Sequence, residues 1–303
     1  MSPRSSDPTS EAAVTREIAV EQAHVDRVYA ELDKASQRAA LVAADGMARG
    51  RTDRTGDIRD EEMSGLFERD ALVFNAARRQ ASLDTQYEGL VFGRLDLAHA
   101  TPGAVSGDGD EAPWWSGRER EIRYVGRLGV RDEDYDPLVI DWRAPAAAAF
   151  YRATPVSPQD VIRRRVLRSQ GTTVLGVEDD LMVTEAPDDM VVVGDGALLA
   201  ALTRSRGARM RDIVATIQQH QDEAIRAPSR GVTEITGGPG TGKTVVALHR
   251  AAYLLYAERR RFEGGGILVV GPSTAYTAYI ERVLPSLGED SVTLRAVGDL
   301  VEA

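Results

Sequence analysis

A glycine-rich segment at residues 237–244 constrains this chain more than any other feature of its sequence. It matches the pattern G-x-x-x-x-G-K-[ST] at every fixed position. Its members are Gly237, Gly238, Pro239, Gly240, Thr241, Gly242, Lys243 and Thr244. The glycines allow positive φ angles, so backbone N–H groups and the start of a following helix can face phosphate oxygens. Lys243 would reach the β- and γ-phosphates, and the Thr244 hydroxyl would bind magnesium. The segment therefore predicts a P-loop that binds a nucleoside triphosphate, most simply ATP with Mg²⁺.

The flanking sequence has the order expected around a P-loop. Residues 231–236 are short and β-branched and predict the preceding strand, although Glu234 makes it less apolar than a buried parallel strand. Residues 244–261 place apolar side chains on one helical face and end in three arginines, where cations suit the helix dipole. Residues 266–272 form an uninterrupted apolar run, which is typical of a central parallel strand. Lys243 is one of only two lysines in the chain, so an accidental match is disfavoured.

The N-terminal third predicts two long helices. Between residues 18 and 42, apolar side chains recur at three- and four-residue steps, and Glu21 interrupts the pattern once. A glycine- and charge-rich break follows at residues 46–60, and a similar seam resumes over residues 63–92. Matched seams joined by a short polar connection favour an antiparallel helical hairpin, a coiled coil that projects into solvent. Two separate helices packed on the rest of the domain are the alternative. The polar turn at the tip of such an arm carries charges of both signs, so it could meet a magnesium-containing site of a partner or remain solvated.

The middle third is strand-rich. Residues 101–118 are dense in glycine and proline and predict a linker. Residues 122–130, 137–142 and 161–167 are short, β-branched and separated by turn residues, which predicts strands. Trp142 and Tyr151 are expected to be core aromatics, since single aromatics in strands usually pack. We expect an arm at 1–100, a linker at 101–118, a strand-rich part of a first motor domain at 119–205, and the first half of a P-loop domain at 206–303.

Composition excludes several classes of function. The chain has 303 residues and a formal net charge of −10, which argues against a broad basic surface for nucleic acid but leaves room for a local basic strip. It has no cysteine, so disulfides and thiolate metal sites are excluded, and its four histidines are far apart in the sequence. No apolar run is long enough to span a bilayer, and the first residues lack a signal core. We therefore expect a cytoplasmic protein without a membrane partner.

Several motifs outside the P-loop carry a family resemblance. They are MRDIVATIQ at 210–218, Gln221 followed by IRAP at 225–228, ALHRAAYLLY at 247–256, VIDWRAP at 139–145, Phe150-Tyr151, GPS at 271–273, Tyr279-Ile280 and VLPSLGE at 283–289. Together with the P-loop they resemble the UvrD/Rep-like superfamily 1 helicase ATPases, and most closely the HelD-type proteins that bind and recycle bacterial RNA polymerase.

This resemblance implies roles for particular residues. Gln221 would be the glutamine whose amide reads the adenine edge, with one donor and one acceptor. Residues 271–273 would lie where related helicases touch single-stranded DNA. The N-terminal helices would form the arm that enters the polymerase, which makes the polymerase core the expected partner and single-stranded DNA a second candidate.

One part of the family pattern is missing. Superfamily 1 motors place an Asp-Glu pair at a strand end after the P-loop, where it holds magnesium and activates water. The Asp-Glu pairs of this chain, such as Asp60-Glu61, Asp132-Glu133 and Asp222-Glu223, precede the P-loop. We therefore expect an incomplete RecA-like P-loop domain with a parallel sheet, from a truncated gene product or a natural short form, with little hydrolysis and no certain catalytic residue. Three functions remain open: part of a polymerase-recycling ATPase, a polymerase-binding protein that holds nucleotide without turnover, or a DNA helicase fragment.

Overall fold

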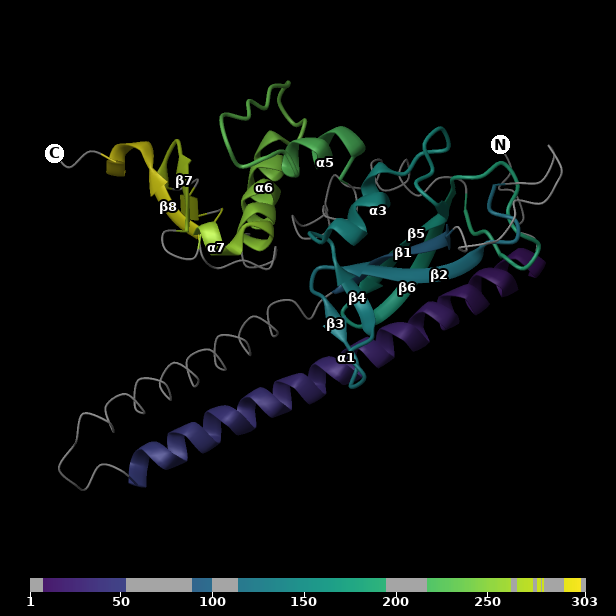
Figure 1. Ribbon diagram of the computed structural model, residues 1–303, viewed down its shortest axis with the longest axis horizontal. Helices are drawn as coiled ribbons and strands as arrows, with labels where there is room; N and C mark the ends of the chain where they lie inside the picture. Colours follow the sequence, from purple (N-terminus) through teal and green to yellow (C-terminus); the bar gives the residue numbers. More distant parts are fainter. Residues whose placement is uncertain are drawn as a thin grey trace.

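The computed structural model describes residues 8–52, 89–99, 114–194, 217–262, 266–274, 277–278, 280 and 292–300 (Figure 1). Within the first of these ranges, side chains are described for residues 12–38 and 40–41. The described part of the chain consists of a long N-terminal helix, a six-stranded sheet and a smaller C-terminal group of helices and strands.

The main sheet is built from the predicted strand-rich region and one strand before it. Its order is β3-β4-β2-β1-β5-β6. The bounds are β1 (Val91–His99), β2 (Glu119–Gly126), β3 (Val130–Arg131), β4 (Pro137–Asp141), β5 (Val161–Gln170) and β6 (Thr173–Leu181). Strands β2 and β4 pair in parallel, and the other neighbours are antiparallel. The prediction of a strand-rich middle is confirmed, and its sheet is largely antiparallel; the parallel sheet was predicted for the P-loop domain that follows. Short turns such as the one between β5 and β6 can join only antiparallel neighbours, because a parallel pair needs a crossover.

The C-terminal group contains the predicted P-loop helix and one of the two predicted parallel strands. Helices α5 (Gln219–Ile225), α6 (Lys243–Ala257) and α7 (Arg259–Phe262) are followed by β7 (Ile267–Gly271) and β8 (Val292–Ala296), which pair in parallel. A short 3₁₀ turn, η6 (Val297–Leu300), ends the described part. The strand predicted at residues 231–236 does not form. Val232 in this stretch is 98% exposed, and none of the described strands pairs with it. Without a neighbouring strand, its backbone has no ladder to join.

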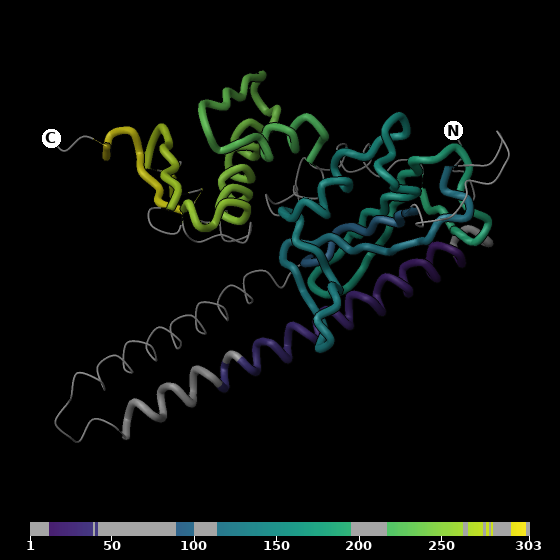
Figure 2. Tube along the Cα trace, in the orientation of Figure 1, coloured from purple at the N-terminus to yellow at the C-terminus, as the bar shows by residue number. Residues whose placement is uncertain are grey.

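Helix α1 (Pro8–Thr52) is longer than predicted and packs on the sheet. It is continuous through Gly46, where a break was expected. Val25, Val28 and Leu32 are buried, and they belong to one core with sheet residues of β1, β4, β5 and β6. This part of the predicted seam therefore packs on the sheet, and the predicted partner helix of the hairpin falls mainly outside the described residues. The helix then runs past the sheet (Figures 1 and 2).

The second predicted helix and the polar turn before it fall mainly on residues 53–88, outside the described part. Its predicted end is wrong, because β1 starts at Val91 although the helix was expected to reach residue 92. Strand β1 lies between β2 and β5 in the sheet. Residues 91–99, which were expected to belong to the arm, are therefore part of the sheet.

A second core joins the sheet to the P-loop helix. After β4, the turn η2 (Pro145–Ala147) and helix α3 (Ala148–Arg152) lie on the side of the sheet opposite to α1 (Figure 1). Trp142, Phe150 and Tyr151 share this core with Ile225 of α5 and with Leu248 of α6. Trp142 is 1% exposed and Tyr151 is 3% exposed, which confirms both as core aromatics.

Candidate nucleotide-binding site

The P-loop (residues 237–244) forms a turn that ends at the start of α6. Gly237, Gly240 and Gly242 have φ angles of 154°, 77° and 87°, which L side chains rarely adopt, and Gly242 is the N-cap of α6. A Cβ atom on Gly237 would lie 2.7 Å from the hydroxyl oxygen of Thr241. That hydroxyl donates to the carbonyl of Gly238 at 2.9 Å. Because the glycines have no side chains, a ligand inside the turn could approach the backbone closely.

Lys243 is the first residue of α6, and its ammonium group folds back over the turn. Its Nζ donates to the carbonyl oxygens of Gly237 at 2.9 Å and of Gly238 at 2.7 Å. The positive end of the α6 dipole lies at the same point. Cradle, ammonium and helix N-terminus together suit a polyphosphate, so the residues present fit the nucleotide that the sequence predicts.

Gln221 is brought to the P-loop although it lies about 20 residues before it. Its Nε2 donates to the carbonyl of Thr241 at 3.5 Å, and its Oε1 accepts from the backbone N–H of Gln218 at 3.0 Å. A Cβ atom on Gly242 would lie 3.2 Å from Nε2. Because the backbone of Gln218 holds the amide oxygen, the amide nitrogen faces the loop.

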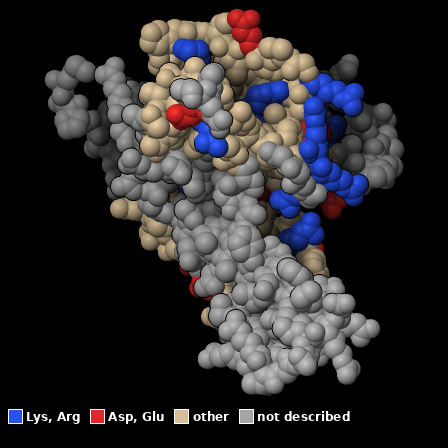
Figure 3. Space-filling model, turned by 90° about the vertical axis from the view of Figure 1, so that its left-hand side faces the viewer, with Lys and Arg blue, Asp and Glu red and all other residues tan. Residues whose placement is uncertain are grey.

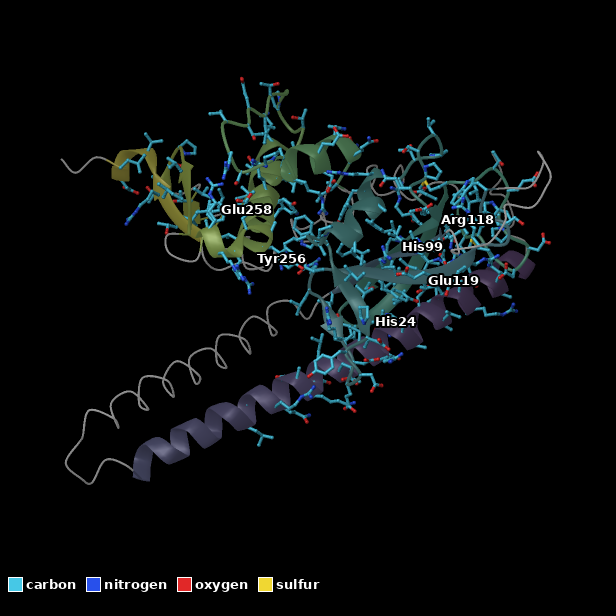
Figure 4. All side chains as sticks on the ribbon, in the orientation of Figure 1. His24, His99, Arg118, Glu119, Tyr256 and Glu258 are labelled. Carbon is cyan, nitrogen blue, oxygen red and sulfur yellow. The ribbon has the colours of Figure 1, made fainter. Side chains whose placement is uncertain are left out.

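Arg250 of α6 attaches the end of α5 to the P-loop helix. Its guanidinium donates to four carbonyl oxygens, those of Ala224, Ile225, Ala227 and Pro228, at 2.6–3.2 Å. A little further on, the Ser229 hydroxyl donates to Glu258 at 2.7 Å, at the end of α6, where Figure 4 shows Glu258 next to Tyr256. Helices α5 and α6 therefore form one unit. In the sequence, Arg250 was notable only as part of a family motif and had no predicted role.

Asp222 and Arg226 are the other residues near the site that sequence reasoning missed. Asp222 is 0% exposed and accepts from Arg226 Nε at 2.7 Å and from Arg152 Nε of α3 at 2.7 Å. The signal that could have found them was the i, i+4 spacing of opposite charges in a short helix that has apolar neighbours.

The Asp-Glu pairs are engaged elsewhere or lie outside the described residues. Asp132 accepts from Arg27 at 2.7 Å and Glu133 from Lys34 at 3.1 Å, both beside α1. Asp60-Glu61 is outside the described part. Among the described residues, no group of three or more His, Asp or Glu side chains could hold a metal ion. Thr244 is the P-loop residue predicted to ligate a magnesium ion that accompanies the nucleotide.

Residues 271–273, predicted to approach single-stranded DNA, lie at the end of β7. Gly271 is buried, whereas Pro272 and Ser273 are exposed. No helix in the described ranges has the length and apolarity needed to cross a membrane.

Comparison with known proteins places the N-terminal part of the chain in a family. The family model described as the N-terminal domain of DNA helicase IV HelD matches residues 18–193. This range covers most of α1 and the whole six-stranded sheet, and it ends before α5 and the P-loop. No curated protein matches the chain. Since the match extends over more than half of the sequence, the chain belongs to the HelD family of DNA-helicase-related proteins.

Proposed function

We propose that this chain binds ATP with magnesium and is the N-terminal part of a helicase-like motor that binds and recycles bacterial RNA polymerase. The main support for ATP binding is the contact between Gln221 and the P-loop. A glutamine amide at 3.5 Å from the loop supplies the donor and acceptor that an adenine edge needs, beside a cradle for phosphates. Lys243 would bind the β- and γ-phosphates, and Thr244 would bind the magnesium ion that accompanies them.

ATP binding is tested with a matched pair of lysine variants. Lys243→Ala removes the ammonium from the P-loop, and Lys34→Ala removes the only other lysine, an exposed side chain on α1. A charge-assisted contact contributes about 1.5–3 kcal/mol, so Lys243→Ala should weaken a fluorescent ATP analogue by roughly tenfold to a hundredfold. Lys34→Ala should bind like the wild type. Equal affinity of all three folded proteins would contradict the assignment of the P-loop.

Little hydrolysis is expected from this chain alone. Water and magnesium need positioned carboxylates, and those of Asp132, Glu133 and Asp222 are already bonded to arginine or lysine side chains. Phosphate release is measured with and without core polymerase. Turnover near about one per second, which is ordinary for an enzyme, would contradict a chain that only holds nucleotide.

The polymerase part of the proposal rests on family membership and on the reach of α1 beyond the sheet. Leu41 lies on the projecting part of α1 and is 69% exposed, whereas Val20 is 50% exposed on the part beside the sheet. If the arm enters the polymerase, Leu41→Asp should reduce co-sedimentation of the full chain with core enzyme, and Val20→Asp should not. Equal retention of both variants would argue against docking through the arm.

A DNA helicase fragment is the second candidate. Arg259, Arg260 and Arg261 of α7 are exposed, and Figure 3 shows Lys and Arg side chains on the face that carries this end of the molecule. Binding through such residues would depend steeply on salt. Salt-sensitive binding of a single-stranded oligonucleotide, without a stable complex with polymerase, would favour this candidate. The net charge of −10 favours the polymerase.

A further inference from the structure

Two consecutive residues of α5 face two different parts of the protein. Gln221 directs its amide to the P-loop, and Asp222 directs its carboxylate to Arg152 of α3, beside the main sheet. Neighbouring residues in an α-helix point about 100° apart, so the direction of one sets the direction of the other. The orientation of Gln221 is therefore tied to the contacts of Asp222.

Asp222 is held by buried charged contacts on both carboxylate oxygens. Oδ1 accepts from Arg226 Nε and Oδ2 from Arg152 Nε, each at 2.7 Å. The carboxylate is completely buried, and the Arg226 side chain is 6% exposed. A buried ion pair depends strongly on its geometry, because the loss of one partner leaves an uncompensated charge. Asp222 therefore has one well-defined position.

Arg226 connects Asp222 to the segment that follows β4 in the sheet. Its guanidinium donates to the carbonyl of Trp142 at 2.7 Å and to that of Arg143 at 3.0 Å, directly after β4. It also lies over the ring of Tyr253 in α6, with 5.2 Å between the guanidinium carbon and the ring centroid. The same group thus touches α5, the segment after β4 and α6.

We propose that Asp222 is a positioning residue for the nucleotide site, which acts through Gln221 and sets the preference for adenine over guanine. The inference rests on the proposed ATP binding. Adenine presents a donor and an acceptor on the edge that carries its amino group, whereas guanine presents two acceptors there. A fixed amide with one acceptor and one donor discriminates between these edges, whereas an amide free to turn can satisfy either base. The backbone N–H of Gln218 holds the amide oxygen against that turn, and Asp222 with its two arginines fixes the rotation of α5 about its own axis, so the held amide stays directed to the P-loop.

The test compares affinities for fluorescent analogues of Mg-ATP and Mg-GTP in the full chain. Asp222→Asn removes the charge that holds both arginines. Arg152→Gln removes the guanidinium that donates to Asp222. Because the Arg152 side chain is 34% exposed, the pair between Asp222 and Arg226 and the core should remain. The control is Asp179→Asn, which breaks another buried Asp-Arg pair, with Arg165, far from α5 in the sheet.

The expected result is a change in the ratio of the two affinities. The wild type should prefer ATP by tenfold or more, and Asp222→Asn and Arg152→Gln should each lower that ratio several-fold toward the value of Gln221→Ala. Asp179→Asn should leave the ratio unchanged. Adding Asp222→Asn to Gln221→Ala should lower the ratio no further, since both act through the same amide.

Each other outcome overturns the inference in a distinguishable way. If the wild type binds ATP with this preference and the ratio is unchanged in Asp222→Asn and Arg152→Gln, the inference is wrong and the proposed function stands. A parallel loss of both affinities would show only a structural role and would also overturn it. If the folded wild type binds neither nucleotide, the proposed function fails and the inference fails with it. Should Asp222→Asn not fold by circular dichroism, Arg152→Gln decides the question.

Discussion

Glu21 of α1 and Arg165 of β5 form an ion pair of 2.8 Å in which both side chains are 0% exposed. The same carboxylate accepts from Arg94 at 2.8 Å and from the hydroxyl of Tyr124 at 2.8 Å. Burial alone would lower the pKa of Arg94, but the charges of Asp96 and Glu21 outweigh it and raise that pKa. Glu21, which interrupts the apolar seam of α1, thus accepts bonds from three side chains of the sheet.

Replacing Glu21 should destabilise the fold strongly. Glu21→Ala removes a buried carboxylate that Arg94 and Arg165 share, although Arg94 keeps Asp96 and Arg165 keeps Asp179 as partners. Breaking a buried ion pair costs up to about 3–5 kcal/mol. The free energy of unfolding is measured by urea denaturation. The control is Glu31→Ala in the same helix. Its partner Lys34 has a 49% exposed side chain, so solvent screens the pair and its loss should change the free energy of unfolding far less. Similar losses in both variants would contradict the importance of the buried pair.

Gly93 of β1 should tolerate no side chain. A Cβ atom there would lie 2.3 Å from the ring of Phe150, which is itself buried. Gly93→Ala should therefore cost about 1–3 kcal/mol through overpacking, as read from the thermal midpoint. Gly129→Ala is the control, because its Cβ atom would meet nothing closer than 3.7 Å. A neutral Gly93→Ala would mean that Phe150 can move away.

Gly242 should matter for nucleotide binding as well as for folding. Its φ angle is 87°, a conformation that costs a residue with a side chain roughly 1–2 kcal/mol, and its Cβ atom would press on Gln221. Gly242→Ala should weaken ATP binding if the proposed function holds. Gly171→Ala is the control. Gly171 has a φ angle of 60° and open space around it, so this variant should lose stability but not ATP binding. Loss of ATP binding in both variants would point to general destabilisation.

The stability should fall on acidification partly because of His249. Burial lowers its pKa to about 4, and the nearby charge of Arg127 acts in the same direction, although the bond to the Val245 carbonyl opposes them. The unfolded chain then binds a proton between about pH 6.5 and 4 that the folded chain does not bind, so stability present above this window is lost as the pH falls through it. The contribution is about 3 kcal/mol.

His249→Phe separates this effect from other groups. The ring of His249 packs edge-on against Trp142, with 5.4 Å between ring centroids, and phenylalanine keeps an aromatic ring there without a titrating nitrogen. Unfolding is followed in urea from pH 7 to pH 4. The variant should lose less stability than the wild type over this range. Burial also lowers the pKa of His24, which remains in both proteins and so cancels in the comparison. Identical profiles would contradict the assignment to His249.

The sequence predicted the local elements better than their partners. Strands β2, β4 and β5 and helix α6 were identified because their apolar patterns and turn residues are local. The helix predicted to residue 92 was wrong at its end, and residues 231–236 form no strand, since a strand requires neighbours that no local pattern specifies. For Glu21, the sequence showed a polar residue in an apolar seam, whereas its partners Arg94 and Arg165 lie 73 and 144 residues away.

In the candidate site, too, the residues of a local motif could be predicted, whereas those that depend on distant contacts could not. The P-loop could be identified residue by residue because its chemistry requires fixed residue types at fixed spacing. Gln221 was assigned through family resemblance alone. Asp222, Arg226 and Arg250 depend on contacts with α3, α6 and the segment after β4, which only the folded chain brings together.

Helix α1 has a mechanical consequence for the molecule. Its N-terminal part is clamped to the sheet by Val25, Val28, Leu32 and the buried charges of Glu21, and the remainder continues to Thr52 without a break. From Leu32 to Thr52 the helix spans about 30 Å, so each degree of tilt at the clamp displaces its far end by about half an ångström. A stiff rod fixed at one end is a lever. Small rearrangements of the sheet under Glu21 would therefore appear, enlarged, at the far end of α1.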